Sequence, residues 1–275
     1  MQPITREQFK VLAALAQAHW GLHLPDRKID LVCGRLTKFL ARSSFASIDE
    51  YIEHLTTSAD EEDRLAFFDI LSTNVTSFFR ERQHFDYLER EFYAPLAAGT
   101  ITLPGKRIRI WSAGCSSGCE PYSIAIHAIQ HLPGIESWDF AVLATDLSTS
   151  VVATAREAVY PESMVGALPQ ELVRAHFLRG TGSRAGMVRV GPAARRLVRV
   201  ARLNLMDEWP MRGPFDIIFC RNVMIYFDRS TRERLVGRFV GLLRPGGVLA
   251  IGSSETLSGV DVPLKSAAPS TYVKA

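Results

Sequence analysis

The segment Ile110–Ser123 has the sequence IWSAGCSSGCEPYS. It begins as a strand-like run and continues into a loop with two glycines and one acidic residue. Gly114 and Gly118 would let the backbone approach a ligand closely, and Glu120 lies where a helical pattern begins. A strand that passes through such a turn into a helix holds a nucleotide-like cofactor in doubly wound α/β folds. The G-x-G-x-x-G spacing of a dinucleotide site is absent, which disfavours NAD and FAD. An ordinary strand–helix turn is the alternative interpretation.

Two further strand-like runs end in polar residues. Leu143–Asp146 (LATD) places a carboxylate where it could accept hydrogen bonds from both hydroxyls of a ribose. Alternatively, Asp146 caps the helix that is expected at Ser148–Arg156. The run Phe215–Phe227 (FDIIFCRNVMIYF) is largely apolar until Arg221-Asn222, where polar groups could meet a ligand at the edge of a sheet.

Strand and helix patterns that could position these groups alternate from about residue 105. Strands are expected at Arg107–Trp111, Phe140–Ala144, Asp216–Cys220 and Val248–Gly252, and helices at Pro121–Gln130, Thr149–Ala158 and Thr231–Leu243. This alternation predicts an α/β fold with a doubly wound, mostly parallel sheet. Residues 5–72 instead carry four apolar stripes at helical spacing, which predict a small all-α domain. Another helix is expected from about Glu81 to Tyr93, ended by Pro95 and Gly99.

The strand–helix alternation is interrupted before Asp216. Met187–Val190 and Leu197–Val200 alternate apolar and basic residues on either side of Gly191-Pro192, a pattern typical of a β-hairpin. We therefore expect a small β insertion at about 178–201. The predicted domain organisation is a helical domain at 1–73, a linker at 74–99 and an α/β domain at 100–275.

The composition is that of a globular protein, with 47% hydrophobic and 22% charged residues among 275. No apolar run reaches the roughly 18 residues that a transmembrane helix needs, so no membrane insertion is expected. Val11–Ala18 superficially resembles a signal peptide, but it is short and contains Gln17, which favours an amphipathic helix. The cysteines lack the spacing of a disulfide framework, which suits a reducing cytoplasm. They are Cys33, Cys115, Cys119 and Cys220.

The charge distribution says more than the net charge of +3. Residues 174–202 hold eight arginines and no carboxylate, whereas residues 43–63 hold seven carboxylates. A local cationic surface implies an acidic partner, either nucleic acid or an acidic protein surface.

Two histidine pairs, His19/His23 and His127/His131, have the spacing that can bind a metal on a helix. Gly21 interrupts the first pair, and neither pair has a third ligand nearby in the sequence. No metal site is therefore expected.

Three stretches together resemble the signatures of the chemotaxis receptor methyltransferases, the CheR family. They are Asn74–Arg80 (NVTSFFR), Glu120–Ser123 (EPYS) and Cys220–Phe227 (CRNVMIYF), with weaker agreement at 242–247 (LLRPGG) and 253–255 (SSE). The resemblance runs in order over essentially the whole chain. It implies a Rossmann-like S-adenosylmethionine-dependent methyltransferase domain behind an all-α domain. The implied reaction transfers a methyl group to glutamate carboxylates of chemoreceptors, leaving S-adenosylhomocysteine.

The resemblance assigns nine residues to the cofactor: Asn74, Thr76, Arg80, Glu120, Asp146, Asn204, Leu205, Asn222 and Val223. Those from the linker would reach over the cofactor. Glu120 would hold the amino group of its methionine part, and Asp146 would bind the ribose. Asn204-Leu205 would flank the adenine, and Asn222-Val223 would line the pocket floor beside the methyl group.

The resemblance also assigns residues to the acceptor protein. Arg80 and Tyr226 would contact the glutamate side chain, which needs no strong general base because it is already ionised at neutral pH. The resemblance implies that one sector of the second helix faces the cytoplasmic receptor helices; an ordinary solvated face is the alternative. Its basic residues are Lys28, Arg35, Lys38 and Arg42. The β insertion is similar to a module that tethers some members to a receptor tail by strand addition, which the sequence leaves open for this chain.

One departure from the family pattern lies beside the cofactor. The family usually shows Gly-Glu-Glu-Pro-Tyr-Ser, and this chain has Gly118-Cys119-Glu120. Glu120 aligns with the second, cofactor-binding glutamate, so binding should survive. Cys119 could be a redox switch, but a small buried thiol is the favoured interpretation.

Two other function classes compete with a receptor methyltransferase. A nucleic-acid methyltransferase would use the arginines on phosphates, but it should carry an Asn/Asp-Pro-Pro-Tyr/Phe motif where this chain has Arg221–Met224. A non-catalytic cofactor-binding receptor module is supported only by Cys119. We expect a cytoplasmic, monomeric enzyme that does not bind nucleic acid.

Overall fold

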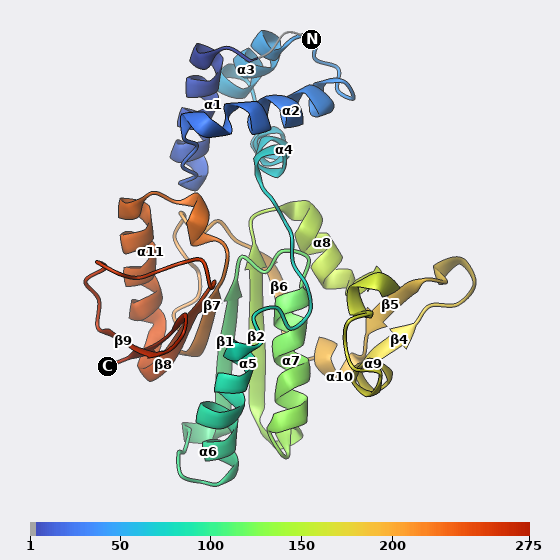
Figure 1. The fold of residues 1–275 in the computed structure, drawn as a ribbon, viewed down its shortest axis with the longest axis vertical. Helices are drawn as coiled ribbons and strands as arrows, with labels where there is room; N and C mark the ends of the chain where they lie inside the picture. Colours follow the sequence, from blue (N-terminus) through green and yellow to red (C-terminus); the bar gives the residue numbers. More distant parts are fainter. Residues whose placement is uncertain (1–3) are drawn as a thin grey trace.

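A computed structural model describes residues 4–275, and Figure 1 shows a helical domain above an α/β domain. The helical domain consists of α1 (Arg6–Trp20), α2 (Ile29–Leu40), α3 (Ile48–Thr57) and α4 (Glu61–Leu71). Thr5 begins α1 with a capping box, in which its hydroxyl accepts the Gln8 amide, and Gly21 ends the helix at a φ of 68°. Buried apolar positions at helical spacing hold the four helices together, as the sequence predicts.

The segment after the helical domain runs extended from Ser72 and then re-enters helix. It forms α5 (Gln83–Leu88), a π-helical segment η2 (Glu89–Tyr93) and α6 (Ala94–Ala97). The helix expected at Glu81–Tyr93 thus begins two residues later and continues past Pro95. Pro95 is the second residue of α6, directly after the π-helical segment, where the helical hydrogen-bond pattern changes.

The α/β domain contains a seven-stranded sheet in the order β6-β2-β1-β7-β8-β10-β9. Its strands are β1 (Arg107–Ala113), β2 (Asp139–Asp146), β6 (Val198–Arg202), β7 (Phe215–Cys220), β8 (Leu243–Ile251), β9 (Leu264–Ala268) and β10 (Thr271–Lys274). The five strands from β6 to β8 pair in parallel, whereas β10 and β9 pair antiparallel. The predicted doubly wound, mostly parallel sheet is therefore confirmed.

Helices cover both faces of this sheet, namely α7 (Cys119–His131), α8 (Thr149–Glu157) and α11 (Arg229–Leu242). Alternate residues of β1 point to opposite faces. Ile110 belongs to the core with α5 and α7, whereas Trp111 packs against Phe239 of α11, with ring centroids 5.2 Å apart. The core around Trp111 also contains the buried residues of α1–α4, so the helical domain shares a hydrophobic core with one face of the sheet.

A second, three-stranded antiparallel sheet projects beside α7, on the right in Figure 1. It consists of β3 (Val159–Pro161), β5 (Met187–Val190) and β4 (Phe177–Arg179), and α9 (Gln170–His176) precedes β4. The sequence correctly indicates a β insertion, but its strands extend back to Val159.

The hairpin predicted between Met187–Val190 and Leu197–Val200 is wrong. The latter run contributes to β6, which pairs in parallel with β2 in the main sheet. Pro192 begins a short helix, α10 (Pro192–Arg195), where the sequence suggested a tight turn. A period of two residues specifies a strand and its buried face, but it does not specify the partner strand.

Among residues 4–275, none of the helices combines the length and the apolarity that crossing a bilayer would require.

Candidate functional site

A pocket lies between the helical domain and the carboxyl ends of the parallel strands. All the residues that the sequence assigns to the cofactor line it: Asn74, Thr76, Arg80, Glu120, Asp146, Asn204, Leu205, Asn222 and Val223. Tyr226, Lys28 and Arg35 line it as well, whereas Lys38 and Arg42 are not among the lining residues. The fold thus brings together side chains from the helical domain, the linker and four loops of the sheet domain.

The loop after β1 approaches the loop after β7 too closely for a side chain at Gly114. Gly114 has a φ of 78°, and a Cβ atom built there would lie 2.3 Å from Cγ2 of Val223. The amides of Gly114 and Cys115 both donate to the carbonyl of Thr145, at 2.8 and 2.9 Å. These bonds fold the loop over the end of β2. Because Gly114 has no side chain, this wall of the pocket can lie close to the wall formed by Val223.

Asp146 ends β2 and points its carboxylate toward this loop. Oδ2 accepts the Ser116 amide at 2.8 Å, and Oδ1 accepts the Ser148 amide at 3.1 Å. Burial raises the pKa of Asp146, and these amide bonds act against that rise. Ser148, rather than Asp146, is the N-cap of α8, which leaves the carboxylate at the pocket.

Glu120 lies in the first turn of α7 and is held on both oxygens. Oε1 accepts the Ser112 hydroxyl at 2.6 Å, and Oε2 lies 3.1 Å from Nη1 of Arg221. Burial raises the pKa of Glu120, whereas Arg221 and the Ser112 hydroxyl oppose the rise.

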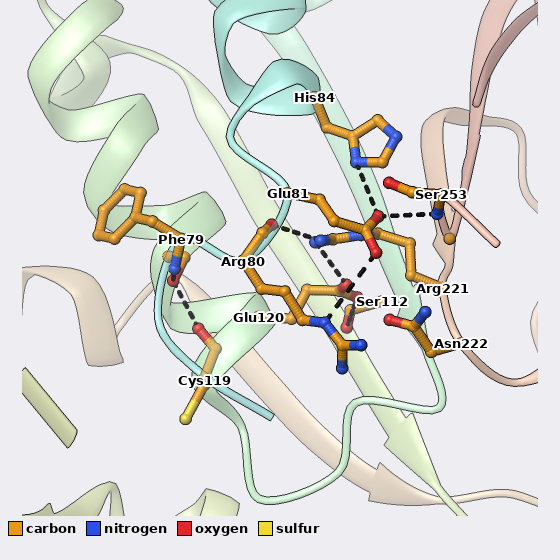
Figure 2. Close-up of polar contacts among 12 residues, drawn as sticks. Phe79, Arg80, Glu81, His84, Ser112, Cys119, Glu120, Arg221, Asn222 and Ser253 are labelled. Atoms are coloured by element: carbon orange, nitrogen blue, oxygen red, sulfur yellow. Dashed lines mark hydrogen bonds and ion pairs between the residues drawn. The ribbon is translucent and has the colours of Figure 1, made fainter. Parts of the chain in front are cut away.

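Arg221 links this carboxylate to a second one from the linker. Figure 2 shows its guanidinium between Glu120 and Glu81, with Nε 3.3 Å from Oε2 of Glu81 and Nη2 donating to the carbonyl of Arg80. The Arg221 side chain is only 3% exposed. Glu81 also accepts the Ser253 amide at 3.2 Å.

Arg221 therefore faces two carboxylates, and Nε of Arg80 lies 4.0 Å from Oε1 of Glu81, so two guanidinium groups balance Glu120 and Glu81. Burial alone would raise the pKa of Glu81, but Arg221, the Ser253 amide and His84 together lower it. Burial, followed by Arg221, lowers the pKa of His84 to about 4, so His84 adds no positive charge at neutral pH. Of these two carboxylates, Glu120 lines the pocket, where it offers an acceptor to a ligand cation such as an α-ammonium group.

The linker is fastened across the pocket mouth. The Ser116 hydroxyl donates to the carbonyl of Asn74 at 3.0 Å, and the Phe79 amide donates to the Ser123 hydroxyl at 2.8 Å. Nη1 of Arg80 donates to the carbonyl of Val75 at 3.1 Å, and the Arg80 side chain stays 39% exposed. The linker thus presents a partly solvated guanidinium at the entrance.

The segment Asn222–Tyr226 follows β7, and hydrogen bonds to Glu255 hold its backbone in place. The carboxylate of Glu255 accepts the amides of Asn222, Ile225 and Gly252 at 3.0, 3.2 and 2.6 Å. At the end of this segment, the Tyr226 hydroxyl donates to the carbonyl of Thr73 at 3.4 Å.

The helical domain reaches the same residue from the other side. Nζ of Lys28 lies 5.5 Å from the centroid of the Tyr226 ring, and the His23 amide donates to the Tyr226 carbonyl at 2.8 Å. Tyr226 therefore lies where the helical domain, the linker and the sheet domain meet.

Two predicted residues make contacts that their assigned roles do not require. Nη1 of Arg35 donates to the carbonyls of Ile70, Leu71 and Ser72 at 3.1, 2.7 and 2.8 Å, at the C-terminal end of α4. Nδ2 of Asn204 donates to the carbonyl of His19 at the end of α1, at 3.0 Å. Both side chains fasten the helical domain around the pocket.

Cys119 is fully buried beneath the linker. Burial raises the pKa of its thiol to about 12, so the thiol stays protonated at neutral pH. This environment matches a buried structural thiol and not a reactive one.

Sequence reasoning places Arg221 at the edge of the sheet near a ligand but gives it no role, and it misses Glu81 and the anchoring contacts of Glu255. Arg221 follows a buried strand directly, which is a visible signal for a functional charge. Its partners, by contrast, are 140 and 101 positions away in the sequence.

Comparisons with known proteins agree with this geometry. Residues 74–273 match the family model "CheR methyltransferase, SAM binding domain", and residues 7–71 match "CheR methyltransferase, all-alpha domain". "Chemotaxis protein methyltransferase 2" of Pseudomonas aeruginosa is 39% identical over 98% of this chain and 93% of its own length. "Chemotaxis protein methyltransferase" is 37% identical in Borreliella burgdorferi, over 98% and 95% of the two chains, and 38% identical in Escherichia coli, over 92% and 85%.

Proposed function

Because the chain belongs to the CheR family of S-adenosylmethionine-dependent methyltransferases, we propose that it methylates glutamate side chains of chemoreceptors. The products are glutamate methyl esters and S-adenosylhomocysteine. The observation that carries this proposal is the position of Arg80 and Tyr226 at a pocket that the Glu120 carboxylate also lines.

The pocket offers acceptors for two polar parts of the cofactor, the ammonium group of its methionine part and the hydroxyls of its ribose. Glu120, with Glu81 behind it, would accept the methionine ammonium, and Asp146 would accept the ribose hydroxyls. The loop at Gly114 passes close enough to Val223 to exclude any side chain between them and so forms a backbone wall. When bound, the cofactor supplies an electrophilic methyl carbon on a sulfonium.

Catalysis then requires position more than proton transfer. A glutamate acceptor has a pKa near 4.3 in water and is already a carboxylate at neutral pH. Arg80 would orient this carboxylate by a charge-assisted hydrogen bond, with the Tyr226 hydroxyl as a second guide. The partial exposure of Arg80 favours a loose grip, because a tight one would stabilise the charged ground state against a neutral ester.

The acceptor is an acidic helical protein surface in this proposal. Lys28 is half-buried at the pocket, and Lys38 and Arg42 are exposed along the same sector, with Leu31 50% exposed among them. Each methyl ester removes one negative charge from a receptor helix and eases repulsion between neighbouring carboxylates. We propose that the enzyme acts as a cytoplasmic monomer. The β insertion is a candidate tether for a receptor tail, since Leu178 on its edge strand β4 is 56% exposed.

The contacts of the arginine-rich segment do not favour a nucleic-acid substrate. Arg202 pairs with Glu61 of the helical domain, and Arg179 pairs with Glu162 at 3.3 Å. Arg189 donates to a backbone carbonyl. These arginines serve internal contacts, which reduces the cationic surface available to phosphates.

The test is methyl transfer from radiolabelled S-adenosylmethionine to receptor-containing membranes. We expect label that mild base releases as methanol, which identifies a carboxyl methyl ester. Base-stable label would contradict the glutamate assignment. Tyr226→Phe keeps the ring beside Lys28 but removes the hydroxyl, so it should lower the transfer rate at least several-fold while S-adenosylhomocysteine affinity stays unchanged. Equal loss of both would show that Tyr226 acts on the cofactor.

A further inference from the structure

A cluster of potential metal ligands lies on the C-terminal half of α7, away from the pocket. The sequence shows His127 and His131 one helical turn apart, and the fold adds Glu89 from η2. Nδ1 of His131 lies 3.4 Å from Oε1 of Glu89, and the two imidazole rings have centroids 4.3 Å apart. One ligand atom from each residue lies within 4.8 Å of the other two.

His127, unlike Glu89 and His131, is buried, so the cluster is more than an ion pair at the surface. It is 5% exposed, and its buried Nδ1 has no hydrogen-bond partner among residues 4–275. Its ring packs against the aromatic rings of Phe85 and Tyr93, at 5.4 and 5.7 Å. A buried imidazole nitrogen without a polar partner is unfavourable, and a metal ion is one partner that would relieve this.

Glu89 comes from an unusual piece of backbone. It opens the π-helical segment Glu89–Tyr93, and such segments are rare and often found at functional sites. The segment packs against α7, so Glu89 reaches the helix that carries both histidines.

We propose that Glu89, His127 and His131 bind a divalent transition metal ion such as Zn²⁺. Two imidazole nitrogens and one carboxylate oxygen form a common zinc ligand set, with water in the fourth position. Ligand atoms around tetrahedral zinc lie about 3.4 Å apart, which the Glu89–His131 pair already matches. The ligand atom of His127 lies within 4.8 Å of the other two, so binding requires its side chain to move closer to them.

The site would clip together two helical segments that carry pocket residues at their other ends. The segment containing η2 follows Arg80 and Glu81 directly, and α7 begins beside Glu120. The histidines lie about 10 to 16 Å along α7 from Glu120, so the metal would not contact the reacting groups. Its effect is on the stability of this helix pair.

The test uses the full chain without an affinity tag, freed of metal and titrated with Zn²⁺ or Co²⁺. We expect one bound ion per chain by calorimetry, Co²⁺ absorption bands typical of a tetrahedral site, and a melting temperature that rises with Zn²⁺. His131→Ala and Glu89→Gln change partly exposed residues and should each weaken binding at least tenfold. His19→Ala, which removes an exposed imidazole on α1, is the matched control and should bind as the wild type does.

Three results would overturn the proposal. The wild-type chain could bind neither ion, or both ligand variants could bind as tightly as the wild type. Binding that survives in both variants but disappears in Cys33→Ser would move the site to a thiol.

Discussion

Arg221 is the residue on which both carboxylates of the pocket depend. It contacts Glu120, Glu81 and the carbonyl of Arg80 from a side chain that is 3% exposed. Removing this cation would take an ion-pair partner from both carboxylates, although Glu81 would keep Arg80 at 4.0 Å. A guanidinium reaches three acceptors in one plane, which a single ammonium group does not.

Arg221→Lys should therefore keep the charge but lose part of the geometry. We expect the free energy of unfolding to fall by about 1–3 kcal/mol, because at least one buried acceptor loses its donor. S-adenosylhomocysteine affinity should fall as well, since Glu120 and Arg80 lose their common anchor. Urea unfolding and calorimetry measure the two effects. Arg90→Lys, at an exposed position of η2, is the control, and equal behaviour of the two variants would contradict the anchoring role.

Glu120 makes cofactor binding sensitive to pH. Burial raises the pKa of its carboxyl, while Arg221 acts in the opposite direction without restoring the usual value. Only the carboxylate attracts an ammonium group, so affinity should fall as pH is lowered through this raised pKa. The fall should begin at a higher pH than for an exposed glutamate, whose pKa is near 4.3.

The measurement is S-adenosylhomocysteine affinity from about pH 8 to about pH 5, a range in which an exposed glutamate stays mostly ionised. Glu120→Gln keeps a side chain of the same shape but loses the charge, so its affinity should be at least tenfold lower and nearly independent of pH. Glu136→Gln changes an exposed carboxylate and should follow the wild-type curve. A wild-type curve that is flat over this range would show that Glu120 does not titrate there.

At the scale of elements, α2 shows that residues on one sector can have separate tasks. Arg35 donates to three carbonyls at the end of α4 and to the Thr73 hydroxyl. Lys38 and Arg42 are exposed. The four basic residues were grouped by sequence as one acceptor surface, but their contacts predict different phenotypes.

Arg35→Lys should lower stability, because the last carbonyls of α4 lose a donor that reaches all of them. Lys38→Ala should leave stability within about 0.5 kcal/mol of the wild type. It should instead slow receptor methylation, with a loss that shrinks as salt is added. Thermal unfolding and initial methylation rates at two salt concentrations separate the two outcomes. A Lys38→Ala enzyme that methylates receptors at the wild-type rate would remove this residue from the docking surface.

The sequence predicts local features of the fold better than pairings between distant elements. Apolar periodicity places the four N-terminal helices and the parallel strands, because burial imposes that pattern on each element separately. The same period of two placed Leu197–Val200 in a strand but assigned it the wrong partner, since alternation carries no information about the neighbouring strand.

For the candidate site too, the sequence predicts residues at local motifs but not the contacts between distant residues. Glu120, Asp146 and Asn222 follow strands at recognisable motifs, and the fold brings them to one pocket. The Glu81–Arg221–Glu120 network could not be read from the sequence, because it joins residues that are more than 100 positions apart. The proximity of Glu89 to His131 could not be read from the sequence for the same reason, since 42 positions separate them and only the packing of η2 on α7 brings them together.

At the scale of the whole molecule, the pocket joins two parts that match separate family models. Trp20, Val32 and Phe68 of the helical domain line it together with residues of the sheet domain. Leu22 forms a β-bridge with Phe227, and the Arg202–Glu61 ion pair spans the same boundary. The buried residues of α1–α4 share one core with the face of the sheet that α11 covers. A contact of this extent couples the unfolding of the two parts.

We therefore expect the helical domain and the sheet domain to unfold as one cooperative unit that the cofactor stabilises. Ligand at about 100 times its dissociation constant should add about 2.7 kcal/mol to the free energy of opening. Hydrogen exchange should show this gain at the amides of α1 and α4 as well as in the central strands β1 and β7, although few residues of α1 touch the ligand pocket. Protection that rises only in the sheet domain would contradict the coupling and would mean that the N-terminal helices open independently of the cofactor site.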